Sequence, residues 1–214
     1  NKRYLYKTDG TAAGTVKVSN VEVRQGVMGT ANNLFFFQAN NTLYKTDGTS
    51  AGTAQVKTTG DIPQNPHSFI DVNGTLYFVA TTSATGQELW KSDGTDAGTV
   101  LIKDINTGTA SGTPYLSPTL ALAVNGILYF SATTAAEGRE LWMTDGTTAG
   151  TQMVKDINPG TSESSPAALV NYSGTLYFIA TNSTNGAEIW KSNGTSAGTT
   201  LLKDMVVGSG SPNI

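Results

Sequence analysis

Short apolar runs recur along the chain, each bounded by Gly, Asn, Asp, Ser or Thr. The clearest share the pattern apolar-Tyr-Phe-x-Ala and begin at Leu76, Leu128 and Leu176, with a variant at 35–39. Both faces of these runs are apolar, which is typical of a strand covered by neighbouring sheets on either side. No segment keeps a 3.6-residue apolar period, and Gly and Thr interrupt every candidate helix. The pattern predicts an all-β chain with almost no helix.

A second pattern reads apolar, aromatic, Lys or Met, Ser or Thr, Asp or Asn, Gly, Thr, and then x-Ala-Gly-Thr. It opens five times, at Leu5, Leu43, Leu89, Leu141 and Ile189. The openings lie 38 to 52 residues apart, close to the roughly 40 to 50 residues of a propeller blade. A unit of this size cannot bury its apolar surface alone, so it must stack on its neighbours.

Turn signals divide each unit into strands. Asn-Gly at 73 and 125 and Ser-Gly at 173 predict tight hairpins, because both central positions of a type I′ turn need positive φ. A third strand opens with Gly-x-Glu at Gly86, Gly138 and Gly186, and a fourth begins at Val100, Gln152 and Thr200. Four antiparallel strands per unit form the blade of a β-propeller.

The expected architecture is a single β-propeller domain over 1–214, with four full blades and a half-blade at each end. The chain opens with only the third and fourth strands of a unit, so it is expected to be part of a larger propeller. The predicted units are 1–20 (partial), 21–60, 61–108, 109–160, 161–208 and 209–214, the start of a further blade.

The repeated motif predicts specific cross-strand neighbours. Pairing Ser92 with Thr99 across the turn places Lys91 opposite Val100 and Glu88 opposite Lys103. The same register pairs Glu140 with Lys155 and Glu188 with Lys203. We therefore expect a Glu–Lys pair at an exposed edge of each blade, contributing about 0.2 to 1 kcal/mol. The aromatic slot, occupied by Trp90, Trp142 and Trp190, is interpreted as packing between blades, with a sugar platform as the alternative.

The turn between the third and fourth strands carries one Asp or Asn in each unit. Its side-chain oxygen can accept hydrogen bonds from backbone N–H groups just ahead of it, and the following Gly supplies positive φ. Because Asn replaces Asp once, geometry rather than charge is expected to matter. These residues are predicted to be structural: Asp9, Asp47, Asp93, Asp145 and Asn193.

Composition narrows the chemistry. The 214 residues carry 13 basic and 16 acidic side chains, a net charge of −3, with no basic cluster for a phosphate backbone, so nucleic acid is not an expected partner. The absence of cysteine excludes disulfides and thiolate metal sites, and one His cannot form a zinc site. No stretch has the roughly 18 apolar residues of a membrane span. Neither a cofactor nor a metal is predicted, with calcium left open.

The segment Glu88–Thr99, Glu-Leu-Trp-Lys-Ser-Asp-Gly-Thr-Asp-Ala-Gly-Thr, resembles the ELWxxDGTxxGT repeat of large bacterial surface and secreted proteins. The match extends to 140–151 and 188–199, and it weakens at 5–15 and 43–53, where Tyr replaces Trp and the Glu is missing. The turn is also similar to the Asp-box hairpin of sialidase-type propellers, which is structural there. The resemblance implies a propeller in a secreted or cell-surface protein, and it carries over no catalytic residue.

The repeat is constant on the hairpin face of the expected propeller, whereas the loops on the opposite face vary. A variable face on a constant scaffold is where binding specificity is usually placed. The candidate binding residues there are Tyr115, Glu137, Arg139, Glu163 and His67. The leading hypothesis is a non-enzymatic extracellular module for adhesion or protein–protein interaction. The alternatives are a carbohydrate-binding propeller with a surface glycan as its partner and a sialidase-like glycosidase.

Overall fold

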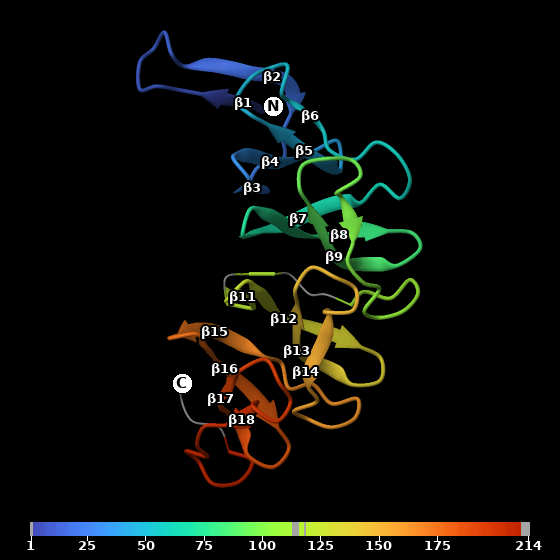
Figure 1. Cartoon of the computed structure of the whole chain (residues 1–214), viewed down its shortest axis with the longest axis vertical. Helices are drawn as coiled ribbons and strands as arrows, with labels where there is room; N and C mark the ends of the chain where they lie inside the picture. The colour runs from blue at the N-terminus through green and yellow to red at the C-terminus, as the bar shows by residue number, and fades with distance from the viewer. Residues whose placement is uncertain (1, 113–115, 118, 211–214) are drawn as a thin grey trace. The chain divides into compact units, whose positions relative to one another are not determined.

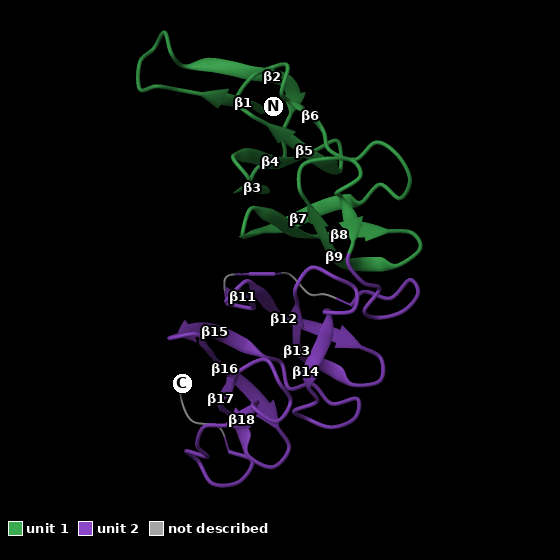
Figure 2. Cartoon of the chain, in the orientation of Figure 1, with its two compact units in different colours: residues 1–101 green, residues 102–214 purple. Residues whose placement is uncertain are grey.

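The computed structural model describes residues 2–112, 116–117 and 119–210, and these form strands and turns without a helix. No described helix could therefore cross a membrane. The chain divides into two compact units, residues 1–101 and 102–214 (Figure 2). The assignment of the whole chain to a single propeller stays a prediction, as do the unit boundaries.

Unit 1 holds one two-stranded and two four-stranded antiparallel sheets (Figure 1). The two-stranded sheet pairs β1 (Tyr4–Lys7) with β2 (Val16–Glu22). The next sheet is β3 (Met28–Ala31), β4 (Leu34–Ala39), β5 (Thr42–Thr46) and β6 (Ala54–Gln55), and the third is β7 (Gln64–Val72), β8 (Thr75–Thr82), β9 (Gly86–Ser92) and β10 (Val100–Leu101).

Unit 2 holds two four-stranded antiparallel sheets with the same sequential order. One is β11 (Ala121–Val124), β12 (Ile127–Thr134), β13 (Gly138–Thr144) and β14 (Gln152–Lys155). The other is β15 (Ala167–Tyr172), β16 (Thr175–Asn182), β17 (Gly186–Ser192) and β18 (Thr200–Leu201). Each predicted full repeat therefore forms one four-stranded sheet in the predicted strand order.

The hairpins form at the positions that the Asn-Gly pairs predict. Asn73 and Gly74 have φ of 52° and 83°, and Asn125 and Gly126 have φ of 53° and 81°. These values match the two positive φ angles of a type I′ turn. Across the motif turn between β9 and β10, Lys91 pairs with Val100, as predicted.

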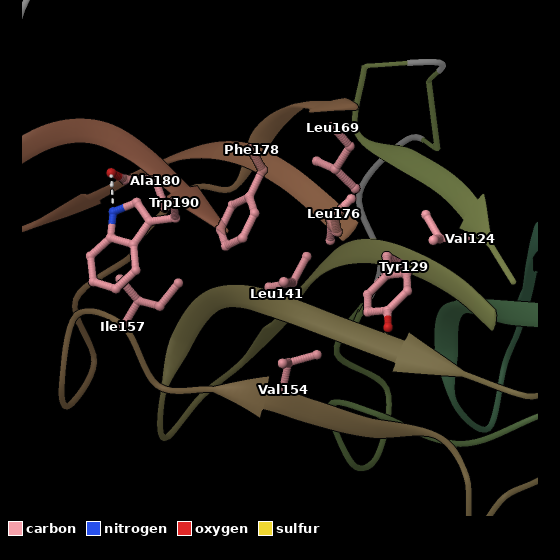
Figure 3. Close-up of a cluster of buried hydrophobic side chains, with 10 residues drawn as sticks. All are labelled: Val124, Tyr129, Leu141, Val154, Ile157, Leu169, Leu176, Phe178, Ala180 and Trp190. Atoms are coloured by element: carbon pink, nitrogen blue, oxygen red, sulfur yellow. Dashed lines mark hydrogen bonds between the residues drawn. The ribbon is translucent and has the colours of Figure 1, made fainter. Parts of the chain in front are cut away.

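The core lies between successive sheets. In unit 2, Leu141 of β13 and Tyr129 of β12 meet Leu176 and Phe178 of β16, with Trp190 alongside (Figure 3). In unit 1, the β3–β6 and β7–β10 sheets share an equivalent cluster that contains Trp90. Burial of the Trp slot confirms the packing interpretation and contradicts the sugar platform, since Trp90, Trp142 and Trp190 are only 2%, 8% and 6% exposed.

Each motif turn is closed by its own side chains. In the β13–β14 turn, Asp145 Oδ1 accepts hydrogen bonds from Thr147 N at 2.8 Å and from the Thr147 hydroxyl at 2.7 Å. The Thr147 hydroxyl oxygen accepts in turn from Gly150 N at 2.9 Å. The Thr151 hydroxyl bonds the Thr147 carbonyl at 2.6 Å and Thr144 Oγ1 at 2.7 Å. Equivalent bonds from the +2 Thr close the turns of Asp9, Asp47, Asp93 and Asn193.

The structural role predicted for these five residues agrees with this geometry. Hydrogen bonds from Thr95 hold the pKa of Asp93 below its usual value. Asn193 Oδ1 accepts the same two bonds from Thr195, at 3.0 Å and 2.8 Å. An acceptor oxygen is therefore the requirement, and a formal charge is not.

The turn also couples neighbouring sheets within unit 1. Asp96, in the β9–β10 turn, accepts hydrogen bonds from Thr58 N at 2.8 Å and Thr58 Oγ1 at 2.9 Å, and Lys57 Nζ lies 3.6 Å from its Oδ1. Thr58 follows β6 of the preceding sheet. The Thr58 bonds, with Thr59 and Lys57, lower the pKa of Asp96 to about 2.

We predict that Gly150→Ala destabilises unit 2 by about 1–3 kcal/mol, because a Cβ there would lie 2.1 Å from Asp145 Oδ1. Chemical denaturation of the full chain measures the effect. In a double-mutant cycle, Asp145→Ala removes the overlapping carboxylate, so the double variant should lose less stability than the sum of the single variants. Strict additivity would contradict this account of the turn.

We predict that Asp96 contributes stability above pH 3.8, its usual pKa, and that the contribution is lost as the pH falls through about 2. Asp96→Asn should lower the melting temperature at neutral pH and flatten its decline between pH 4 and 2. Thermal unfolding over a pH series measures both effects. Asp61→Asn, at an exposed position of the β6–β7 connection, is the matched control and should leave the curve unchanged.

Candidate functional site

The recurring Glu of the third strand is buried rather than exposed at an edge. Glu140, on β13, has no exposed surface. Its Oε2 accepts a hydrogen bond from Ile157 N at 3.0 Å, and its Oε1 accepts from Ser164 N at 3.1 Å. Asn158 N and the Ser164 hydroxyl complete the set. The carboxylate therefore holds the β14–β15 connection against β13.

The Gly two residues before this Glu makes room for the same connection. A Cβ at Gly138 would lie 2.6 Å from the Ser162 carbonyl oxygen, and one at Gly186 would lie 2.1 Å from that of Gly210. Glu188 Oε1 accepts from Val206 N at 3.4 Å. We call the Gly and Glu of this motif the Gly-x-Glu clamp. It positions the connections of unit 2, including the loop that carries Glu163.

The expected Glu–Lys pairs are wrong. The β13–β14 register shifts between Leu141 and Trp142, so Lys155 lies opposite Leu141 instead of Glu140. Lys155 Nζ donates to the Thr199 carbonyl at 2.9 Å, and Lys103 Nζ donates to the Thr151 carbonyl at 2.8 Å. The lysines thus bind the motif turn of the next sheet. Burial raises the pKa of Glu140, and the hydrogen bonds from Ser164, Ile157 and Asn158 act in the opposite direction.

Two of the predicted binding residues come together in unit 2. Arg139 Nη2 lies 3.8 Å from Glu163 Oε2, and both side chains are about 40% exposed or more. Glu163 also accepts a hydrogen bond from the Ser165 hydroxyl at 3.2 Å. An exposed pair of this kind contributes at most about 1 kcal/mol to stability. It presents both signs of charge on the surface of the loop.

The other predicted residues lie elsewhere. Glu137 is bonded into the β12–β13 turn, where it accepts from the Thr134 hydroxyl while its N donates to Thr134 Oγ1 at 3.0 Å. Tyr115 lies outside the described residues. His67 belongs to unit 1. The role of these residues as a binding surface stays a prediction.

His67 lies on β7 in a half-buried polar setting. Its Nδ1 is 2.9 Å from Ser68 Oγ, and its Nε2 is 3.4 Å from Gln87 Oε1. Burial lowers the pKa of His67, against a smaller opposing effect of Gln87. The ring acts as a hydrogen-bonding group between Ser68 and Gln87. Within the part of the chain that the structure describes, no three His, Cys, Asp or Glu side chains form a metal-binding group.

A cavity of about 660 Å³ opens in unit 1 beside β1. Its lining comes from β1, from the β3–β4 hairpin and from the β5–β6 turn. Leu5, Lys7, Leu34, Phe35 and Gly48 are among the lining residues. Sequence reasoning did not find this cavity.

Unit 2 exposes apolar side chains on its last sheet. Val170 and Tyr172 of β15 are 56% and 70% exposed, and Tyr172 packs edge-on against Tyr177 with ring centroids 6.4 Å apart. Val207, in the segment after β18, is 93% exposed. Val170 and Tyr172 lie two residues apart on one strand, and neighbouring exposed apolar side chains mark an interaction surface more often than single exposed residues do.

Three solved structures align with the chain. Pyrococcus horikoshii acylaminoacyl peptidase aligns with a TM-score of 0.53 and 11% identity, over 89% of this chain and 28% of that chain. A puromycin hydrolase mutant aligns with a TM-score of 0.47 and 13% identity, over 80% and 28%. An α-L-arabinofuranosidase from Clostridium thermocellum aligns with a TM-score of 0.32 and 15% identity, over 89% and 75%.

The first of these alignments confirms the predicted fold class: the chain is all-β, with the four-stranded antiparallel sheets of a β-propeller domain. The chain spans 28% of the length of the peptidase and the hydrolase. No family model matches the sequence, and no curated protein matches it.

We predict that Glu140→Leu destabilises unit 2 by about 2–4 kcal/mol, because it leaves the N–H groups of Ile157 and Asn158 without their acceptor. Hydrogen exchange should accelerate at these two amides first. Glu163→Leu is the control, since its exposed ion pair contributes little, and it should change stability by less than about 0.5 kcal/mol. Equal effects of the two changes would contradict the clamp.

Proposed function

We propose that the chain is a non-enzymatic, extracellular β-propeller module that binds a protein partner. The observation that carries the proposal is the apolar face of the β15–β18 sheet, where Val170 and Tyr172 are more than half exposed. Tyr contributes a large contact area at low entropic cost, and for this reason it is enriched in protein interfaces. Such a face favours a partner with a complementary apolar surface.

The motif residues support a scaffold rather than a catalyst. The turn carboxylates accept hydrogen bonds from Thr residues of their own turns. The Glu140 carboxylate accepts hydrogen bonds from backbone N–H groups of the β14–β15 connection. The repeat thus uses its acids to build sheets and join them, and binding specificity is left to residues between the motifs.

The extracellular location rests on the resemblance to the ELWxxDGTxxGT repeat, strongest at 88–99, 140–151 and 188–199. Abundant Gly, Thr, Ser and Asn with few Lys and Glu fits the same class of bacterial surface or secreted protein. The peptidase and hydrolase activities in the names of the aligned structures belong to those proteins, of which this chain covers 28%.

A carbohydrate-binding module is the second candidate, and Tyr172 favours it. Its ring is 70% exposed and is supported from one side by Tyr177. An exposed, braced aromatic ring can stack on the apolar face of a sugar. The protein partner is preferred because Val170, beside Tyr172 on β15, adds an aliphatic group that offers a sugar no hydrogen bonds.

The test presents the immobilised chain with panels of extracellular proteins and of surface glycans and measures binding by interferometry. We expect binding to a protein that falls at least tenfold in the Val170→Asp, Tyr172→Ser double variant. Val16→Asp, at a 41% exposed position of unit 1, is the matched control and should bind like the parent chain. Binding confined to glycans, or turnover of a glycan, would overturn the proposal.

A further inference from the structure

A small polar cavity lies in unit 1, where the connection that precedes the β3–β6 sheet meets the end of β4. Its volume is about 290 Å³, and its lining comes from residues 22–24 and 38–41. The polar lining residues are Glu22, Arg24, Gln38, Asn40 and Asn41. Small-molecule sites usually span roughly 300 to 1,000 Å³, so this cavity suits a small polar ligand.

The cavity is open because the β4–β5 turn is short. β4 has 6 residues, whereas β12 and β16 have 8, and Asn40 and Asn41 form a two-residue turn with φ of 47° and 61°. In the β11–β14 sheet the longer turn lies against the preceding connection, where Ala135 N donates to Asn106 Oδ1 at 3.1 Å. An equivalent bond forms in the β15–β18 sheet. The short turn of unit 1 leaves this space uncovered.

Gln38 departs from the repeat at the same place. Its position, opposite the apolar residue that opens the motif, is occupied on the other second strands by Val79, Ser131 and Ile179. The Gln38 carbonyl accepts from Arg24 N at 2.9 Å, which fixes the two lining segments side by side. The side chain is only 1% exposed, yet neither Nε2 nor Oε1 has a hydrogen-bond partner in the described part of the chain. A buried carboxamide without partners is costly, so it calls for a partner from outside the chain.

Two opposite charges border the same cavity. Glu22 and Arg24 flank Val23, which is buried and whose N donates to the Arg3 carbonyl at 3.0 Å. Both charged side chains are exposed and line the cavity. Among the described residues Arg24 has no ion-pair partner, and Glu22 has an exposed contact of 3.9 Å with Lys2. Such a contact is weak, so both charges are available to a ligand.

These groups match a small molecule that carries both a carboxylate and an ammonium group. A guanidinium binds a carboxylate through parallel N–H donors, and a carboxylate accepts from an ammonium group. The three carboxamides of the lining each present donors and an acceptor, which suits a further polar group on the ligand. The described lining contains no aromatic ring on which a sugar could stack.

We propose that this cavity binds a free α-amino acid with a polar side chain, its carboxylate at Arg24 and its ammonium group at Glu22. The ligand's side chain lies toward Gln38 and supplies the hydrogen bonds that the buried carboxamide lacks. A ligand carboxamide fits best, because it pairs one donor and one acceptor with those of Gln38. The site lies in unit 1, apart from the protein-binding face proposed for unit 2.

The test titrates L-glutamine into the full chain and measures binding by isothermal calorimetry. We expect saturable binding of one molecule per chain. Nα-acetyl-L-glutamine amide keeps the side chain but lacks both charges, and L-methionine keeps both charges but lacks the carboxamide. Each should bind at least tenfold more weakly, because each loses charge-assisted or buried hydrogen bonds.

Two variants test the residues. Arg24→Met removes the carboxylate partner at an exposed position and should weaken binding at least tenfold. Lys17→Met removes a cation from an exposed position of β2 outside the cavity and is the matched control, with normal binding expected. Gln38→Leu places an apolar residue where the repeat carries Val79 and Ile179, so it should keep or raise the melting temperature while binding falls at least tenfold.

The proposal is overturned if L-glutamine shows no saturable binding at up to about 10 mM, or if the uncharged analogue binds as well as L-glutamine. Normal binding by Arg24→Met or by a folded Gln38→Leu chain would overturn it too, and Arg24→Met decides if Gln38→Leu does not fold. Any of these failures would leave the proposed function standing, since its test concerns the β15–β18 sheet.

Discussion

The side-chain oxygen at the tip of each third-to-fourth-strand turn is the acceptor on which the sheets depend. In the turn of Asp145, one oxygen fixes Thr147, and Thr147 then fixes Gly150 and Thr151. Because the turn satisfies its own polar groups, it presents a rigid surface of defined shape. The neighbouring sheet uses that surface: Lys45 bonds the Gly94 carbonyl at 2.6 Å, and Lys155 bonds the Thr199 carbonyl. The same hydrogen-bonded turn therefore closes its own hairpin and provides the contact surface for the neighbouring sheet.

Much of this architecture could be predicted from the sequence, because the strongest signals are local. A type I′ turn needs positive φ at two adjacent positions, and Asn-Gly tolerates this well, so Asn125 and Gly126 predicted a hairpin without any knowledge of the fold. The repeat fixed strand order, and the substitution of Asn193 for Asp indicated that an acceptor matters more than charge. The Trp slot was interpretable because a large ring must be buried somewhere in a stack of sheets.

The features that escaped prediction depend on tertiary contacts. A register extended from Ser92–Thr99 gave Glu–Lys pairs, but a single irregularity between Leu141 and Trp142 moves Lys155 by one position. Glu140 then lies beneath a connection whose path no local pattern specifies, and Gly138 leaves the space for it. The cavity beside β1 was missed for a related reason, since its lining combines side chains from β1, the β3–β4 hairpin and the β5–β6 turn. Of the predicted loop residues that the structure describes, Arg139 and Glu163 lie together.

The self-contained turn has a consequence for how such a chain changes over evolutionary time. Each repeat carries its own acceptor and donors for the bonds inside its turn, and the lysine of the preceding repeat meets the turn at a backbone carbonyl, a group that every repeat provides. Duplicating or deleting one repeat by recombination would therefore keep the internal hydrogen bonds of every remaining turn, because their donors and acceptors are encoded within one short segment. Copy number can change while these turns stay intact, and new loops can be acquired one blade at a time.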